Sequence, residues 1–355
     1  MTNKNIYNFF LFLSNLTRNL VQVFSIVLLY NKGYSIENIL LFLLVMYISG
    51  IIVNIGSLII NYKTVLIIST IIYGISYIYL SIMNYNIINL IILAILLSIS
   101  TYSYHAIRHK LGLIMLNHHR DNNINIILII NYISIIISNI LGIILIKKLP
   151  LLITSIVIFI LSSISIYPII KLKDNISIKY KYKGINLTRK KITFNILEQF
   201  KVILVELQPL YLYIYINNNI TYIGIFNIII NIASLIVMII INNNIKINYI
   251  KYITILLGII LTIKLNLNNI ILLLLIAFLE GIGIKLFEKN SLYSLYYNIK
   301  KSNAVTYLLI EELIFFATKS IIMLIFILLI KDLKMILYIC IAGIVLSGFY
   351  LKIDK

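Results

Sequence analysis

The stretch KLKDNISIKYKYKGINLTRKK, residues 171–191, is the longest polar segment of the chain and lies almost at its midpoint. It carries eight of the 30 Lys and Arg residues, whereas long apolar runs dominate the chain on either side. We interpret it as a basic linker, a pattern that also serves as an orientation signal beside a membrane. The expected organisation is therefore a first half at 1–170, a linker at 171–192 and a second half at 193–355.

Each half holds six apolar runs long enough to span a bilayer, which takes about 20 mostly apolar residues per helix. Of the 355 residues, 61% are hydrophobic and 12% are charged, a composition that argues against a soluble domain. The expected spans are 8–30, 37–60, 64–83, 87–107, 124–146, 150–170, 193–216, 220–241, 249–265, 269–288, 303–330 and 333–350. The sequence therefore predicts an all-α integral membrane protein with 12 transmembrane helices.

The distribution of positive charge predicts that both termini lie in the cytoplasm. A formal charge of +19 would also suit a nucleic acid or anionic lipid, but the cations lie mostly in short gaps between apolar runs. With the termini placed inside, 21 Lys and Arg residues lie on the inner side and 6 on the outer side. This bias follows the positive-inside rule for an even number of spans. We expect a multi-pass protein of the cell inner (plasma) membrane that contacts membrane lipids and no nucleic acid.

The two halves are similar in layout along the chain. Segments 18–50 and 201–233 each contain a helix with a buried cation, a Tyr-rich outer end, a short polar turn and a second helix with small residues. The basic connections at 105–123 and 285–303 also match in length and position. Two repeated halves joined by a basic cytosolic linker are typical of one large group of secondary transporters, in which the solute site lies between the halves.

On these features the chain resembles the major facilitator superfamily, particularly its short, divergent bacterial members. The stretch FSIVLLYNKGYSIENILLFLLVMYISG at 24–50 is similar to the family's first outer turn and second helix. The next inner loop keeps Gly56, Asn61 and Lys63 of the family's pattern but lacks its acidic residue and second Gly. The resemblance implies two pseudo-symmetric six-helix lobes rocking about a central site, with helices 1, 4, 7 and 10 lining the path.

Polar residues inside the expected spans are candidates for function, because a charge in the bilayer costs at least about 2.5 to 3.5 kcal/mol on insertion scales. Arg18 and Gln22 share one face of the first helix. Lys201 lies at a comparable depth in the seventh span. We expect these three residues to bind the substrate, with a mild preference for a small anionic or zwitterionic solute. For the two cations, a structural ion pair is the alternative.

Carboxylates inside the spans suggest a coupling ion. Glu206 and Glu280 lie deep in the seventh and tenth spans. A carboxylate in a low dielectric favours its neutral form and can take up and release a proton. We expect proton coupling by these two residues, with a packing salt bridge as the alternative for each. Four further residues are expected to act in gating or in interhelical ion pairs: Glu198, Glu311, Glu312 and Lys319.

Other motifs argue against enzymatic or cofactor chemistry. The single Cys340 closes no disulfide or metal site by itself and is expected to be a small apolar filler. The His-rich segment at 105–119 lacks convergent acidic ligands. Gly281 and Gly283 form a GxG without a preceding strand, so they are expected to let helices approach and not to bind a nucleotide. We expect no cofactor, no metal and no enzymatic activity.

The sequence therefore predicts a secondary active transporter that moves a small solute by alternating access, with proton coupling as a further hypothesis. A membrane subunit of an energy-transducing complex is one alternative, although the six-plus-six division argues against it. A membrane enzyme acting on lipid-linked substrates is another, although its outer loops offer only Glu37 and Asp332 as carboxylates. A relic of the transporter fold that no longer transports is a third.

Overall fold

The computed structural model describes residues 3–115, 120–171, 188–216, 218–240, 249–297, 304–330 and 332–350, which form 14 helices and, within these ranges, no strand. We call residues 3–171 the N-terminal half and residues 188–350 the C-terminal half. The N-terminal half contains α1 (Asn3–Gln22), α2 (Ser25–Asn31), α3 (Ile36–Ile59), α4 (Tyr62–Ile82), α5 (Ile87–Met115), α6 (Arg120–Lys148), α7 (Leu151–Ile164) and α8 (Ile166–Lys171). The C-terminal half contains α9 (Arg189–Tyr215), α10 (Ile220–Ile240), α11 (Ile250–Lys264), α12 (Ile270–Tyr297), α13 (Ala304–Leu329) and α14 (Leu333–Tyr350).

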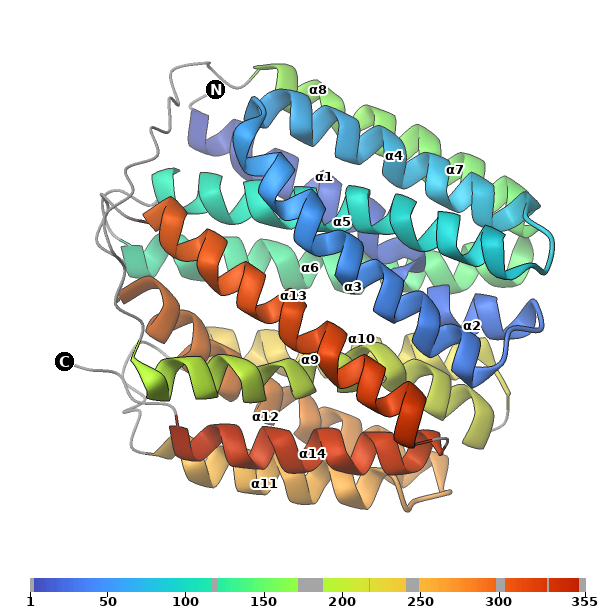
Figure 1. The fold of residues 1–355 in the computed structure, drawn as a ribbon, viewed down its shortest axis with the longest axis vertical. Helices are drawn as coiled ribbons and strands as arrows, with labels where there is room; N and C mark the ends of the chain where they lie inside the picture. The colour runs from blue at the N-terminus through green and yellow to red at the C-terminus, as the bar shows by residue number, and fades with distance from the viewer. Residues whose placement is uncertain are drawn as a thin grey trace.

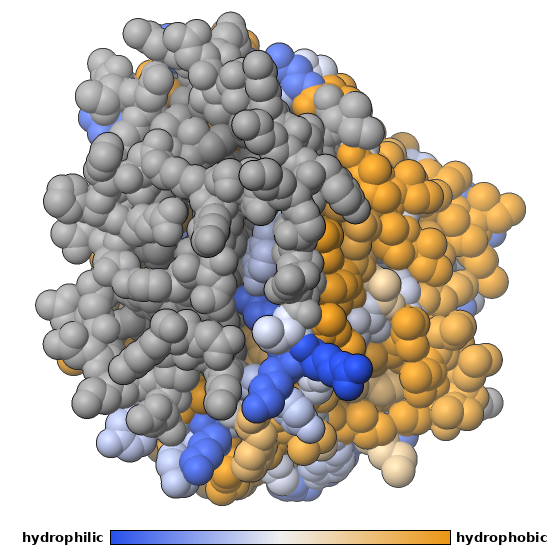
Figure 2. Space-filling model, turned by 60° about the vertical axis from the view of Figure 1, so that its left-hand side comes forward, coloured by the Kyte–Doolittle hydropathy of each residue, from blue (hydrophilic) through white to orange (hydrophobic). Residues whose placement is uncertain are grey.

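The helices form one bundle (Figure 1). Ten segments of the described residues are long and apolar enough to cross a membrane. Figure 2 shows a largely hydrophobic side of the bundle, with hydrophilic residues beside the grey region. Many large apolar side chains point outward, and four of them are 72–77% exposed: Ile52, Ile240, Ile271 and Leu329. Such a surface is stable in lipid and not in water, so the chain is a multi-pass membrane protein.

Two of the expected spans are each formed by two helices. The run predicted at 8–30 divides into α1 and α2 at Val23 and Phe24, and the run predicted at 150–170 divides into α7 and α8 at Ser165. The Ser165 hydroxyl donates to the carbonyl of Ser162 at 2.7 Å. Hydroxyl groups that bond back to the preceding turn bend helices. Each run is still one candidate membrane span, Asn5–Asn31 and Leu151–Lys171, so the two predicted spans are confirmed although each is built from two helices.

Several helices extend beyond the predicted spans. α5 ends at Met115 and α12 at Tyr297, each beyond the expected span. α9 begins at Arg189, where the Thr188 side chain accepts a hydrogen bond from the Lys191 backbone N–H. Such an N-cap satisfies one of the free backbone donors at a helix start. The last part of the expected linker therefore belongs to α9, and residues 172–187 lie outside the described residues.

Helix packing follows a similar scheme in the two halves. In the N-terminal half α5 packs against α3 and α4, and α4 also packs against α7. In the C-terminal half α12 packs against α10 and α11, and α11 also packs against α14. The main contacts between the halves join α3 to α13 and α6 to α10. The surface between the halves is therefore built from helices of both, and any cavity there has walls from each.

Glycines allow two helix pairs, α1 with α6 and α10 with α12, to approach closely. A Cβ atom at Gly142 of α6 would lie 2.1 Å from the carbonyl oxygen of Leu20 in α1. One at Gly281 of α12 would lie 2.3 Å from the carbonyl oxygen of Ile230 in α10. Both distances are far below van der Waals contact, so only glycine fits without a backbone shift. The expectation that Gly281 serves helix approach is confirmed.

The bundle has two distinct ends. The start of α1 and the last turn of α14 lie at the same end, which we call the terminal end (Figure 1). At the opposite end α2 packs against α9. Tyr30 and Tyr213 meet there edge to face, with ring centroids 6.3 Å apart. The two halves are therefore in direct contact at the end opposite the termini.

Candidate functional site

Two cavities with charged side chains in their walls lie between the halves. The larger cavity, about 460 Å³, is lined by α1, α3 and α5 of the N-terminal half and by α9, α12 and α13 of the C-terminal half. The smaller cavity, about 280 Å³, is lined by α1, α2, α6 and α9 to α12. Along α9 the larger cavity contacts residues 191–206 and the smaller one residues 205–212. The cavities are therefore stacked along α9, with Gln22, Val205 and Glu206 in the wall between them.

The larger cavity is lined by most of the site residues that were predicted from the sequence. Its charged lining has five carboxylates and three ammonium groups, all from the C-terminal half: Glu198, Glu206, Glu288, Glu311, Glu312, Lys191, Lys201 and Lys319. Seven of the nine predicted site residues line it: Gln22, Glu198, Lys201, Glu206, Glu311, Glu312 and Lys319. Glu280 lines the smaller cavity, and Arg18 lines neither of these two. Six of the seven come from α9 and α13 alone.

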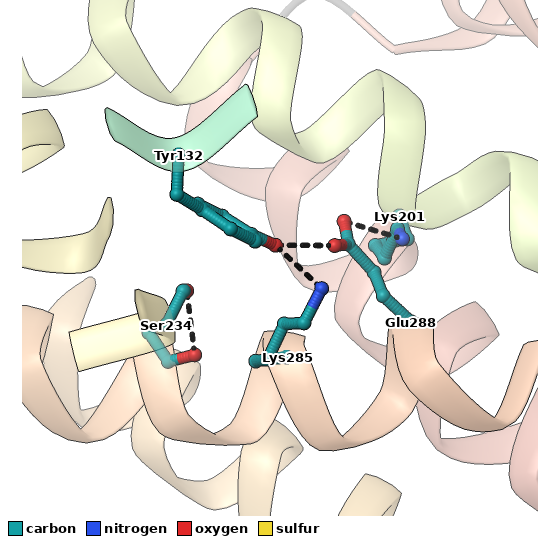
Figure 3. Close-up of polar contacts among 6 residues, drawn as sticks. Tyr132, Lys201, Ser234, Lys285 and Glu288 are labelled. Atoms are coloured by element: carbon teal, nitrogen blue, oxygen red, sulfur yellow. Dashed lines mark hydrogen bonds and ion pairs between the residues drawn. The ribbon is translucent and has the colours of Figure 1, made fainter. Parts of the chain in front are cut away.

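One polar network joins the halves through Tyr132 of α6 (Figure 3). The Tyr132 hydroxyl donates to Glu288 Oε2 at 3.0 Å and accepts from Lys285 Nζ at 3.1 Å. Lys201 Nζ lies 3.2 Å from Glu288 Oε1. Glu288 therefore neutralises Lys201 within the C-terminal half while it also binds a hydroxyl of the N-terminal half.

Sequence reasoning missed most of this network. Lys285 is the first residue of the basic connection expected at 285–303, yet it is 0% exposed, because α12 continues as far as Tyr297. The prediction for Lys285 is therefore wrong. The i, i+3 spacing of Lys285 and Glu288 was a signal that both lie on one face of a helix. Tyr132 had no signal of its own, because tyrosine is frequent throughout the chain.

A second polar contact joins the halves at Glu206. The hydroxyl of Tyr47, on α3, donates to the Glu206 carboxylate on α9. The Lys319 ammonium lies 4.9 Å from the centroid of the Tyr47 ring. The charges of Glu206 and Glu312 both act on this ammonium. Glu206 therefore lines both cavities, contacts the N-terminal half through Tyr47 and lies in the same cavity wall as the buried Lys319.

Glu280 lies in a buried ion pair. Its Oε2 is 2.5 Å from Lys264 Nζ, and its Oε1 accepts a hydrogen bond from Gln208 Nε2 at 3.0 Å. Lys264 was counted on the outer side, at the end of the span expected at 249–265, and it is 1% exposed. The reason is that α11 ends at Lys264 inside the bundle, where Glu280 compensates its charge. The packing salt bridge that the sequence left open for Glu280 is present.

The remaining carboxylates of the larger cavity have different surroundings. Glu311 of α13 forms an interhelical ion pair with Lys191 of α9 at 3.2 Å and accepts from Asn195 Nδ2 at 3.3 Å. Glu198 lines the cavity beside them. Glu312 faces the same cavity and, within the described residues, has no hydrogen bond or ion pair.

Arg18 is enclosed within the N-terminal half. Its guanidinium donates to the carbonyl of Ser100 at 3.0 Å and to the hydroxyl of Ser69 at 3.5 Å. The guanidinium carbon lies 4.0 Å from the Tyr104 ring centroid and 4.8 Å from that of Tyr73. These aromatic faces and oxygens stabilise the cation without a carboxylate. The structure therefore does not bring Arg18 together with Lys201.

This position predicts the effect of Arg18→Lys. The guanidinium's planar stacking and forked hydrogen bonds are lost, so we expect the free energy of unfolding in detergent to fall by about 1–3 kcal/mol. Solute affinity should stay unchanged, because Arg18 lines neither cavity. Arg189→Lys, at an exposed position, is the matched control. A changed solute affinity in well-folded Arg18→Lys protein would support the substrate-binding role predicted from the sequence.

Comparison with known proteins identifies the fold. No protein-family model and no curated protein matches the sequence. Among solved structures, a mutant of the nucleoside transporter NupG superposes with a TM-score of 0.69 at 12% identity over 98% of both chains. The human organic anion transporter MFSD10 (TETRAN) superposes with a TM-score of 0.67 at 11% identity, again over 98% of both chains. The chain therefore has the fold of major facilitator superfamily transporters.

Proposed function

We propose that this protein is a secondary active transporter that moves a small solute across the membrane by alternating access. The larger cavity is the observation that carries the proposal, because α1, α3 and α5 face α9, α12 and α13 across it. A site shared by two halves opens to either side when the halves rock about it. The similarity to a nucleoside transporter and an organic anion transporter supports the same class of function.

The proposal includes two six-helix lobes, at 1–170 and 193–355, joined by the basic linker at 171–192. α9 and α11 complete a set of 12 spans, although charged residues interrupt α9 and α11 is 15 residues long. The corresponding packing of α3, α4 and α5 and of α10, α11 and α12 supports this symmetry. The bias of positive charge supports cytoplasmic termini and a cell inner membrane.

The proposed solute is zwitterionic. Five carboxylates and three ammonium groups line the larger cavity, so its walls accept a positive group more readily than a purely negative one. Support for an anionic solute is weaker, since Arg18 lies elsewhere and Lys201 is paired with Glu288. A solute with both charges matches a lining that has both.

We further propose that Glu206 couples transport to protons. It lines both cavities and bonds to Tyr47 across the two halves, so a change in its charge acts on the contact between them. Glu280 is the weaker candidate, because Lys264 and Gln208 already hold its carboxylate. A proton on Glu206 removes the charge that attracts Lys319 and leaves Tyr47 a neutral acceptor.

Proteoliposomes containing the purified protein test both solute transport and its coupling to protons through Glu206. We expect the protein to move protons across the membrane when one pool of solutes is added, among amino acids, sugars, organic acids and amines. Glu206→Gln should abolish this proton movement. Glu37→Gln, at an exposed position, is the matched control and should leave it intact. Solute uptake that keeps its pH dependence in Glu206→Gln would exclude this residue from coupling. If folded protein moves no solute from any pool, the proposal fails.

A further inference from the structure

The ammonium group of Lys319 lies in a cage of three aromatic rings in the wall of the larger cavity. Its Nζ is 4.7 Å from the Phe316 ring centroid, 4.9 Å from that of Tyr47 and 5.6 Å from that of Tyr102. A cation within about 6 Å of a ring centroid is attracted to the ring face, more strongly when water is excluded. All three rings are buried. We call Tyr47, Tyr102 and Phe316 the ammonium cage.

The surroundings of the cage carry an excess of negative charge. Glu206 and Glu312 line the larger cavity together with Lys319, and the lining of this cavity has five carboxylates for three ammonium groups. The Tyr47 hydroxyl stabilises Glu206, whereas Glu312 has no hydrogen bond or ion pair within the described residues. An incompletely compensated carboxylate in a low dielectric favours the arrival of a further cation.

A buried hydroxyl in the cage lacks a partner. Tyr102 is 7% exposed and lines the larger cavity, and its hydroxyl has no hydrogen bond among the residues that the structure describes. A buried hydroxyl without a partner costs free energy, so such groups in native structures are commonly satisfied by a ligand or water. Its oxygen can accept a hydrogen bond from an ammonium N–H. This observation is independent of the charge excess and indicates the same kind of ligand.

We infer that the ammonium cage binds the amino group of the solute, which displaces the Lys319 ammonium and takes over its ring contacts. The inference rests on the proposed function and names the solute class as one that bears a primary amine. Lys319 is then a tethered competitor that occupies the cage when solute is absent. Tyr47 and Tyr102 belong to the N-terminal half and Phe316 to the C-terminal half, so the exchanged cation contacts both.

Equilibrium binding of radiolabelled n-butylamine to the purified full-length protein in detergent tests the inference without requiring transport. Lys319→Met removes the tethered competitor and should raise the affinity about tenfold or more, since the vacated cage keeps its rings and both carboxylates. Lys251→Met is the matched control, because Lys251 also lies over an aromatic ring, at 4.8 Å from the Tyr252 centroid, but is exposed outside the cavity. It should leave the affinity unchanged.

Two further variants test the cage should Lys319→Met fail to fold. Phe316→Leu removes one ring, and Tyr102→Phe removes the hydroxyl but keeps the ring. Both should weaken n-butylamine binding in an otherwise native chain. Unlabelled n-butanol and butyrate, which match the probe in length but carry no ammonium, should not compete.

The outcomes separate the inference from the proposed function. Binding that is absent, or unchanged by all three cage and lysine variants, overturns the inference. If the protein nevertheless transports some other solute in proteoliposomes, the inference fails and the proposed function stands. Binding that follows the expected pattern supports the ammonium cage. If the same protein transports no solute in proteoliposomes, the proposed transport function fails while the ammonium cage stands.

Discussion

Replacing Lys264 with Met is expected to lower the free energy of unfolding by about 3–5 kcal/mol, the range found when one partner of a buried ion pair is removed. Lys264 and Glu280 are 1% and 0% exposed, and their charged atoms lie 2.5 Å apart. In Lys264→Met the Glu280 carboxylate keeps its hydrogen bond from Gln208, but no cation compensates its charge. Denaturant unfolding of detergent-solubilised protein measures the loss.

The double variant Lys264→Met/Glu280→Gln shows whether the loss comes from the ion pair. Neither charge remains, and the new amide oxygen still accepts the bond from Gln208, so most of the stability should return. Lys251→Met, at an exposed lysine, should change the free energy of unfolding by less than about 0.5 kcal/mol. Losses that simply add in the double variant would contradict the pair. Uptake that keeps its pH dependence in the double variant would exclude Glu280 from proton coupling.

Tyr132→Phe is expected to shift the equilibrium between closed and open arrangements of the two halves at the terminal end by about 10- to 150-fold. The range corresponds to roughly 1.5–3 kcal/mol for a hydrogen bond to a charged group. The Tyr132 hydroxyl joins α6 to Glu288 and Lys285 of α12, whereas the Lys201–Glu288 pair lies within the C-terminal half and is kept. The variant therefore removes a contact between the halves and leaves both helices intact.

Distances between spin labels measure this shift. Cys340 is buried, and Cys340→Ala gives a cysteine-free chain in which labels at Thr64 and Tyr252 report on the two halves at their exposed positions. The population with the longer distance should grow in Tyr132→Phe. Tyr167→Phe, at a residue 59% exposed, is the matched control. Unchanged distance distributions in Tyr132→Phe would show that this link does not hold the halves together.

The helical architecture was predictable because it depends on local composition. A backbone in lipid must satisfy its own hydrogen bonds, so each long apolar run becomes a helix whatever its neighbours are. The run predicted at 37–60 is α3, Ile36–Ile59, and the run predicted at 333–350 matches α14, Leu333–Tyr350. Cys340, expected to be a small apolar filler, is fully buried among apolar side chains. Local pattern failed at a helix break near Ser165 and at helix ends, where α5 and α12 continue beyond the predicted spans.

The site was predictable as a set of residues but not as a set of partners. A charge inside an apolar run has a high cost wherever it lies, so the sequence alone nominates Glu206, Glu280 and Lys201. Which charge compensates which depends on the helix faces that come together, and no local stretch contains that information. Tertiary packing alone decided that Glu280 pairs with Lys264 and Lys201 with Glu288. It also placed Arg18 among aromatic rings, because the approach of helices distant in sequence sets the geometry of every buried charge.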